Sequence, residues 1–244
     1  TREGEYIQQS IINLFNIKKV IGIDLDYTFK GNSKIFSNRL NDSFTWIPVE
    51  IFIKNNKSQK IQIFLENYKK LISSINFQQF FNYNGINLWD EIKNIFVEMT
   101  FSPHLPFYLN LVDSLMESFS KNSPKTFFLP YETGPIALCI IAVCKKYGIP
   151  TVGVQHGHIY QFNPMYCYLN SLENQLKYGF FLPDYILLFG DSTKKLLLKN
   201  NYPVEKLVVF GNPAFFGLEN FVKFFDKSIF LEKYKIKPNQ QIIL

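Results

Sequence analysis

A regular alternation of strand-like and helix-like segments in the second half of the chain constrains the fold most. From residue 126 onward, short apolar runs typical of buried strands alternate with segments of helical periodicity. Strands are expected at TFFLP (126–130), TVGV (151–154), YILLF (185–189) and LVVF (207–210), and helices at 135–147, 192–200 and from 214 onward. Because parallel strands need such long crossovers, the alternation predicts an α/β fold: a Rossmann-like parallel sheet with helices on both faces.

The most distinctive unit is the helix that runs into the TVGV strand. The segment PIALCIIAVCKKYG (135–148) is apolar nearly all round, opens with proline at the first helical position and closes with two lysines and a glycine. The strand after it stops abruptly at Gln155, His156 and Gly157. A buried parallel strand ends in this way when it delivers polar side chains to a site.

The first half of the chain is less regular. A strand is expected at 18–24 and a second apolar stretch at 44–53, and helical periodicity follows at 60–74, 88–98 and 106–119. We therefore predict one Rossmann-like domain over residues 1–220, with a helical insert at about 57–120. Residues 221–244 are interpreted as a linker and the first strand of a C-terminal domain.

Composition favours a globular protein and argues against several functional classes. Hydrophobic residues make up 47% of the chain, which is ample for a core, and no apolar run approaches the roughly 18 residues of a membrane span. The net charge of +6 comes from scattered lysines, so no nucleic-acid partner is expected. Three cysteines without CxxC spacing argue against disulfides and zinc. These features predict a cytoplasmic protein. Peripheral association with the inner face of the membrane stays an alternative.

Polar and glycine residues follow nearly every expected strand. In an open parallel sheet, ligands bind beyond the carboxyl ends of the strands, where loops and helix N-termini present free N–H groups. The residues that we expect to line such a site are Asp24, Glu132, Gln155, His156, Gly157, His158, Gly190, Ser192, Gly211 and Asn212. His156 and His158 lack a nearby carboxylate or cysteine motif, so no metal site is expected.

The order GVQHG, PDYILLFG, KKLLLKN and YPVEKLVVFGNP resembles the acceptor-side half of a GT-B glycosyltransferase-like protein. The closest likeness is to surface-polysaccharide and teichoic-acid-type transferases with a Gln-His-Gly or Trp-His-Gly turn, and it covers about residues 124–213. The resemblance implies transfer of a sugar, or a related phosphate-activated unit, to a cell-surface or lipid-linked saccharide. The nucleotide-linked donor would bind the C-terminal domain, so no cofactor is expected in this chain and the fragment alone should be inactive.

The resemblance places His156 in the cleft between the two domains, as a general base or phosphate contact. An imidazole titrates near neutrality and can take a proton from an acceptor hydroxyl. The alternative is a histidine that only fixes the turn. Glu132 is the second catalytic candidate. The alternative is that Glu132 is only a solvated surface residue. Gln155 is expected to help orient the acceptor.

Two other functional classes remain open. IGIDLDYTF (21–29) matches the first motif of haloacid-dehalogenase-type phosphatases, with Asp24 as nucleophile, Asp26 as general acid and Mg²⁺ between carboxylate and phosphate. Against this, Lys194 and Lys195 stand where a second metal-binding carboxylate is expected.

The third class is a non-catalytic domain that binds a glycan or lipid carrier. Its surface would be built from the aromatic side chains of the helices between 88 and 119. Such a helical stripe is more often part of the core. The aromatic residues concerned are Trp89, Phe96, Phe101, Phe107 and Tyr108.

Overall fold

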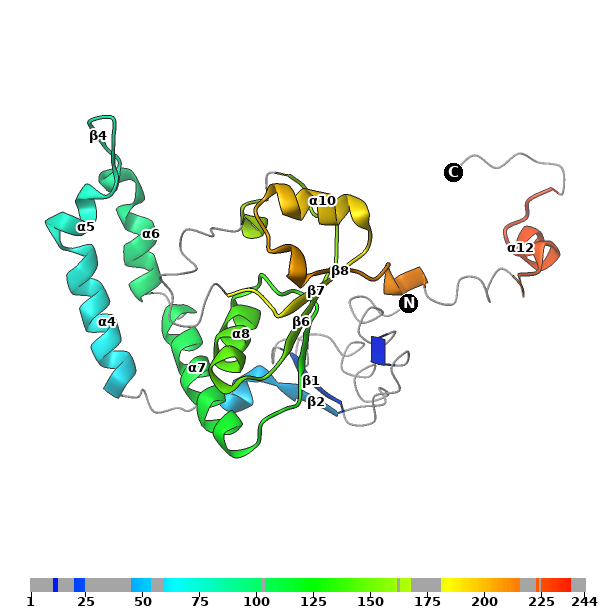
Figure 1. Ribbon diagram of the computed structural model, residues 1–244, viewed down its shortest axis with the longest axis horizontal. Helices are drawn as coiled ribbons and strands as arrows, with labels where there is room; N and C mark the ends of the chain where they lie inside the picture. The colour runs from blue at the N-terminus through cyan, green and yellow to red at the C-terminus, as the bar shows by residue number, and fades with distance from the viewer. Residues whose placement is uncertain are drawn as a thin grey trace.

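The computed structural model describes residues 11–12, 20–24, 45–53, 59–101, 104–161, 163–167, 181–215, 223 and 225–237. These residues form a body around a four-stranded sheet, a separate pair of strands, and a helical arm that projects from the body (Figure 1).

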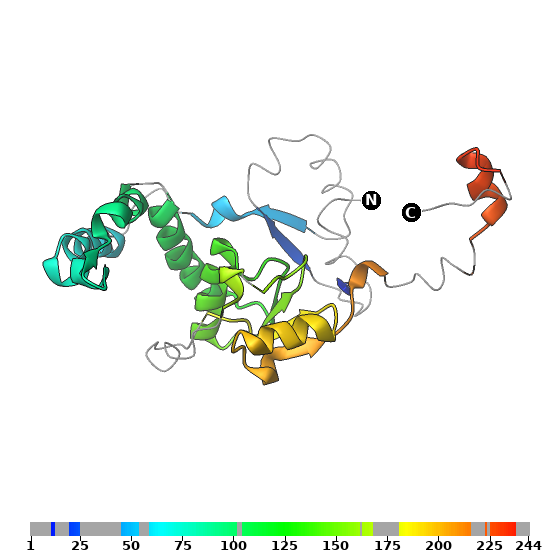
Figure 2. The ribbon, with the colours of Figure 1, turned by 90° about the horizontal axis from the view of Figure 1, so that it is seen from above.

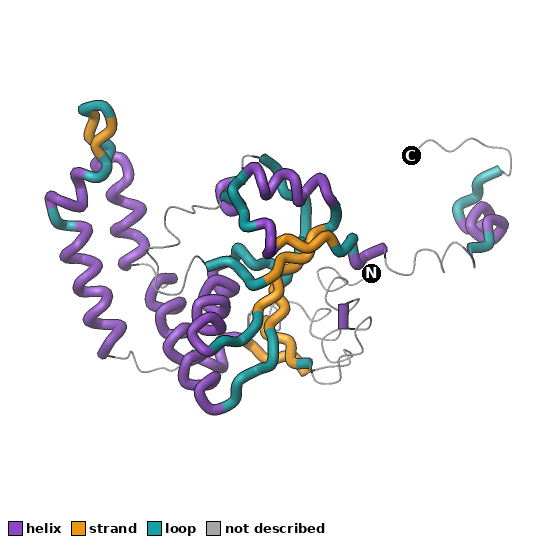
Figure 3. The backbone as a smooth tube through the Cα atoms, viewed as in Figure 1, coloured by secondary structure: helices purple, strands orange, loops and turns teal. Residues whose placement is uncertain are grey.

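The main sheet is entirely parallel, and its strands lie in chain order. It consists of β5 (Phe127–Leu129), β6 (Thr151–Val154), β7 (Tyr185–Leu188) and β8 (Leu207–Val209). Two helices connect its strands, α8 (Pro135–Tyr147) after β5 and α10 (Asp191–Lys199) after β7. The predicted α/β fold with a parallel sheet flanked by helices is confirmed, and Figure 3 shows the helices against the strands.

Different segments of the chain pack on the two faces of the main sheet. The register aligns Leu129, Gly153 and Ile186 across the sheet, so these positions lie on the same face. Leu129 therefore packs with α8, and Ile186 packs with Leu197 of α10, on that face. The opposite face presents Val154, which is buried against Ile11, a residue with helical backbone.

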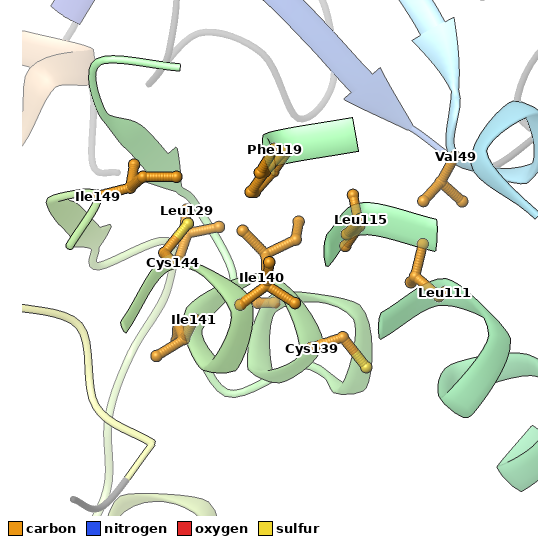
Figure 4. Close-up of a cluster of buried hydrophobic side chains, with 12 residues drawn as sticks. Val49, Leu111, Leu115, Phe119, Leu129, Cys139, Ile140, Ile141, Cys144 and Ile149 are labelled. Carbon is orange, nitrogen blue, oxygen red and sulfur yellow. The ribbon is translucent and has the colours of Figure 1, made fainter. Parts of the chain in front are cut away.

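Helix α8 is apolar nearly all round because it is buried between the sheet and α7 (His104–Lys121). Figure 4 shows Leu115 and Phe119 of α7 facing Ile140 of α8, with Cys144 turned toward Leu129 of β5. The predicted ends of α8 are correct. Its first residue is Pro135, and its C-cap is Gly148 with φ of 67°, a left-handed conformation that favours glycine.

The strand that ends in Asp24 does not join the main sheet in the described residues. Strand β1 (Ile21–Asp24) pairs in parallel with β2 (Thr45–Pro48) and with no other described strand. The 3-10 helix η1 (Val49–Phe52) follows β2 and packs against α7 through Val49. Asp24 thus ends a strand of a different sheet in the described residues, and its place at the predicted rim stays a prediction. Local apolar character predicted the strand but not its partner.

The arm is an antiparallel helical hairpin with a small core of its own. It contains α4 (Gln59–Ile72), α5 (Ile75–Gln79), β3 (Asn82–Tyr83), β4 (Ile86–Asn87) and α6 (Trp89–Phe101). The two long helices match the prediction, whereas α5 and the β3–β4 hairpin were not predicted. The arm extends away from the sheet in both views (Figure 2). Helix α7, expected in the insert, packs into the main core.

The last described helix is α12 (Lys227–Lys233), whose N-cap Asp226 accepts hydrogen bonds from two backbone N–H groups. Short 3-10 helices complete the described elements: η2 (Pro164–Tyr166), η3 (Val204–Lys206) and η4 (Pro213–Phe215). The boundary at 220 and the expected strand at 242–244 lie outside the described residues. None of the described helices is both long and apolar enough to cross a bilayer.

Candidate functional site

The candidate site lies at the carboxyl edge of the main sheet, where β5 and β6 end side by side. The loop 130–134 follows β5 and leads into α8, and the turn 155–158 follows β6. Because the two strands are hydrogen-bonded neighbours, the loop that carries Glu132 and the turn that carries His156 lie at the same edge of the sheet.

His156 is exposed at this edge and is held by an aromatic neighbour. Its imidazole meets the ring of Tyr131 edge to face, with ring centroids 4.9 Å apart and an interplanar angle of 76°. Partial burial lowers the pKa of His156 below its ordinary value, and an interaction with the Pro130 backbone opposes this shift. The imidazole is therefore mainly neutral at pH 7, which is the form that accepts a proton.

Gln155 is buried and fixes the turn that carries His156. Its Nε2 donates to the carbonyl of Gly157 at 2.8 Å, and its Oε1 accepts from the backbone N–H of Phe189 at 2.8 Å. Its own N–H donates to the carbonyl of Leu187 at 2.9 Å. Both ends of the amide are thus engaged by backbone groups, so in this structure Gln155 joins the ends of β6 and β7.

Glu132 is buried to 2% exposure, which excludes the alternative of a solvated surface residue. Neither carboxyl oxygen makes a hydrogen bond of regular geometry within the described residues. Burial raises the pKa of Glu132 to about 7, while its own backbone and the hydroxyl of Tyr166 partly offset that rise. At neutral pH this carboxyl group is therefore divided between its neutral and ionised forms.

Glu132 is accommodated because the strand beneath it carries a glycine. A Cβ on Gly153 would lie 3.1 Å from Cγ and 3.2 Å from Cβ of Glu132. Tyr166 and Tyr202 are also buried here, and desolvation followed by the charge of Glu132 raises the pKa of both phenols. We call Glu132, Thr133, Tyr166 and Tyr202 the buried acidic cluster.

The other predicted residues lie in different environments. Gly157 and exposed His158 follow Gln155 in the same turn, and Gly190, in an extended conformation, is the N-cap of α10. Exposed Ser192 is in the first turn of α10. After β8 come Gly211, with a left-handed φ of 93°, and half-buried Asn212. For Asp24 the structure describes the backbone alone, and Asp26 lies outside the described residues.

Sequence reasoning missed the residues that surround Glu132 and His156. Tyr131 follows the TFFLP segment but was assigned no role, and Tyr166 and Tyr202 belong to no motif. Gly153 carried a usable signal, because a glycine inside an apolar strand indicates close approach of another group. Among the described residues, no three His, Cys, Asp or Glu side chains gather in a way that could hold a metal ion.

Comparison with known proteins assigns no family. Neither a protein-family model nor a curated protein matches this chain. A solved structure similar to it is UDP-GlcNAc 2-epimerase from Neisseria meningitidis bound to UDP-GlcNAc, with 11% sequence identity and a TM-score of 0.34. The alignment covers 91% of this chain and 54% of that one, so the chain spans about half the length of the epimerase. At this level of similarity we infer neither fold nor function from it.

Proposed function

We propose that this chain is the acceptor-side part of a GT-B-type glycosyltransferase, with His156 as the general base. The observation that supports this most is the state of His156, which is exposed at the carboxyl edge of a parallel sheet and has a lowered pKa. Ligands bind at that edge in open α/β sheets. Tyr131 and Gln155 hold the turn so that the imidazole has a defined position.

The proposed chemistry is the attack of an acceptor hydroxyl on the sugar carbon of a nucleotide-linked donor. As the oxygen attacks, His156 takes the hydroxyl proton, the new glycosidic bond forms, and the bond to the nucleotide phosphate breaks. The leaving nucleotide carries away the electron pair. The donor would be held by a second domain, and the acceptor would be a cell-surface or lipid-linked saccharide.

Glu132 acts in this proposal as a positioning residue. At 2% exposure its carboxyl group does not reach a ligand in this conformation. It directly follows Tyr131, whose ring contacts His156, and its side chain fixes the loop against β6. Loss of Glu132 would therefore disturb His156 through this loop. The remaining strand-end residues, His158, Ser192 and Asn212, would contribute substrate contacts.

The test is nucleotide release by the full-length natural protein, supplied with UDP-, GDP- and CMP-linked sugars and short saccharide acceptors. Chromatography would measure the free nucleotide. His156→Asn should lower the rate by about a hundredfold or more, because general-base catalysis contributes that much. His104→Asn, at the start of α7 and remote in sequence from the turn, is the matched control and should retain the wild-type rate.

Two results would contradict the proposal. One is a His156→Asn variant that turns over like the wild type. The other is tight binding of a nucleotide sugar by this 244-residue chain alone, measured by calorimetric titration, because the proposal assigns donor binding to the second domain. Mg²⁺-dependent hydrolysis of an aryl phosphate that is lost in Asp24→Asn would favour the phosphatase alternative.

A further inference from the structure

The end of the helical arm carries an exposed apolar surface that the proposed function does not use. It is formed by side chains of α5 and its C-cap, the β3–β4 hairpin and the residue before α6, with exposures from 41% to 85%. We call this set the arm tip: Ile75, Phe80, Tyr83, Ile86 and Leu88. Phe80 is the most exposed large hydrophobic side chain in the described part of the chain.

The arm already packs together the aromatic rings that its own fold requires, with Trp89 buried and the others half-buried. Phe77, Phe81, Trp89 and Phe96 form a cluster with ring centroids 5.4 to 5.7 Å apart. Phe80 is next to Phe81 in the chain but lies outside this cluster. The aromatic cluster of the arm is thus complete without Phe80. Large exposed apolar patches mark interaction sites.

The tip has a fixed shape. Asn84 and Gly85 have φ angles of 50° and 81°, as a two-residue hairpin turn requires. The hairpin register places Tyr83 opposite Ile86, so these two exposed side chains stand together on one face. The hairpin lies at the far end of the arm (Figure 1). The surface is therefore a projection and not a groove.

Charge distribution indicates which partner fits this projection. No Asp, Glu, Lys, Arg or His occurs from residue 71 to residue 89, and the other polar residues of the hairpin are asparagines. Lys69 and Lys70 lie in the last turn of α4, immediately before this uncharged stretch, and Asp90 and Glu91 lie in the first turn of α6, immediately after it. An uncharged apolar projection that carries a tyrosine, with charged residues of both signs only at its base, suits the boundary between lipid headgroups and acyl chains.

We propose that the arm tip inserts into the surface of a lipid bilayer. Phe80, Tyr83 and Ile86 enter the acyl boundary, the hairpin asparagines meet the headgroup layer, and Lys69 and Lys70 lie near the phosphates. A fluid bilayer closes around a convex projection, whereas a protein partner would need a matching pocket. Apolar insertion is the main contribution, so binding persists at high salt. This inference stands independently of the proposed glycosyl transfer.

The experiment is co-sedimentation of the full chain with vesicles of phosphatidylcholine, and of phosphatidylcholine with phosphatidylglycerol, at low and high salt. Wild type should bind both to a similar extent, because two basic and two acidic residues border the uncharged stretch. Phe80→Ser with Tyr83→Ser should reduce partitioning about tenfold or more, since each change removes buried apolar area. Both side chains are exposed, so the double variant retains its fold. Phe215→Ser, at a side chain 64% exposed on η4, is the matched control.

A second measurement reports the depth of the tip. Lipid brominated on its acyl chains should quench the tryptophan fluorescence of Phe80→Trp more strongly than that of wild type. The wild-type fluorescence comes from Trp46 and Trp89. Absence of wild-type binding to both vesicle types, or equal binding by the double variant, would overturn the proposal. So would sedimentation velocity showing a dimer that the double variant abolishes, because the tip would then contact a second copy.

Discussion

The side chain of Glu132 lies against the backbone of Gly153, and no other residue type would leave it that space. A Cβ at position 153 would lie 3.0 Å from Cγ of Pro183 and 3.1 Å from Cγ of Glu132. Both neighbours are buried, so neither can move aside freely. The loop after β5 and the strand β6 are therefore fitted to each other beneath the candidate site.

Gly153→Ala should lower the free energy of unfolding by about 1 to 3 kcal/mol, the usual cost of adding a methyl group to a tightly packed site. Urea denaturation would measure it. Gly157→Ala is the matched control, because a Cβ there meets nothing within 4 Å and its stability should remain close to wild type. Equal stability of both variants would show that Glu132 and Pro183 do not constrain Gly153.

The pKa of Glu132 makes stability depend on pH. Burial raises this pKa from 4.5 to about 7, so the folded state holds the proton more tightly than the unfolded state. The stability that protonated Glu132 gives the folded state is fully present below the pKa of the unfolded state. It is lost as pH rises through the pKa of the folded state. The loss amounts to roughly 3 kcal/mol. Glu132→Gln should remove this decline, leaving a variant that is more stable than wild type above neutrality.

Unfolding free energies measured at a series of pH values on both proteins would test this. Glu50→Gln, at a half-buried glutamate of η1, provides the matched control and should retain the decline of the wild type. A wild-type curve that does not fall between pH 4.5 and about pH 7 would mean that Glu132 is not the buried acid described above.

Much of this arrangement follows from local sequence, but the surroundings of Glu132 do not. Helix α8 was predicted with both ends because Pro135 and Gly148 act within one turn of the helix. The β3–β4 hairpin was missed because its strands have two residues each, too short for an alternating pattern. The buried acidic cluster depends on Tyr166 and Tyr202, which meet Glu132 only after the chain has folded.

The amide of Gln155 should stabilise the fold independently of any ligand. Gln155→Leu leaves the N–H of Phe189 and the carbonyl of Gly157 without this partner, and a buried polar group without a hydrogen bond costs about 1 to 3 kcal/mol. Urea denaturation of the variant should show this loss. Gln59→Leu, at an exposed position of α4, should change stability little. A stable Gln155→Leu variant would contradict the structural role.

The three cysteines should differ sharply in reactivity toward a thiol reagent. Burial raises the pKa of Cys139 to about 11 and that of Cys144 to about 12, and both side chains lie in the core between α7 and the sheet. Cys167 is exposed just after η2. Because the thiolate is the reactive form, Ellman's reagent at neutral pH should modify Cys167 rapidly in the native chain.

Denaturant should release the other two thiols, and Cys167→Ser should abolish the rapid phase while leaving the slow one. Cys144→Ser is the control that keeps the rapid phase. Rapid native modification of all three thiols would mean that α8 is not buried between α7 and the sheet. That outcome would also remove the support for the loop 130–134, which leads into α8 and carries Tyr131 and Glu132.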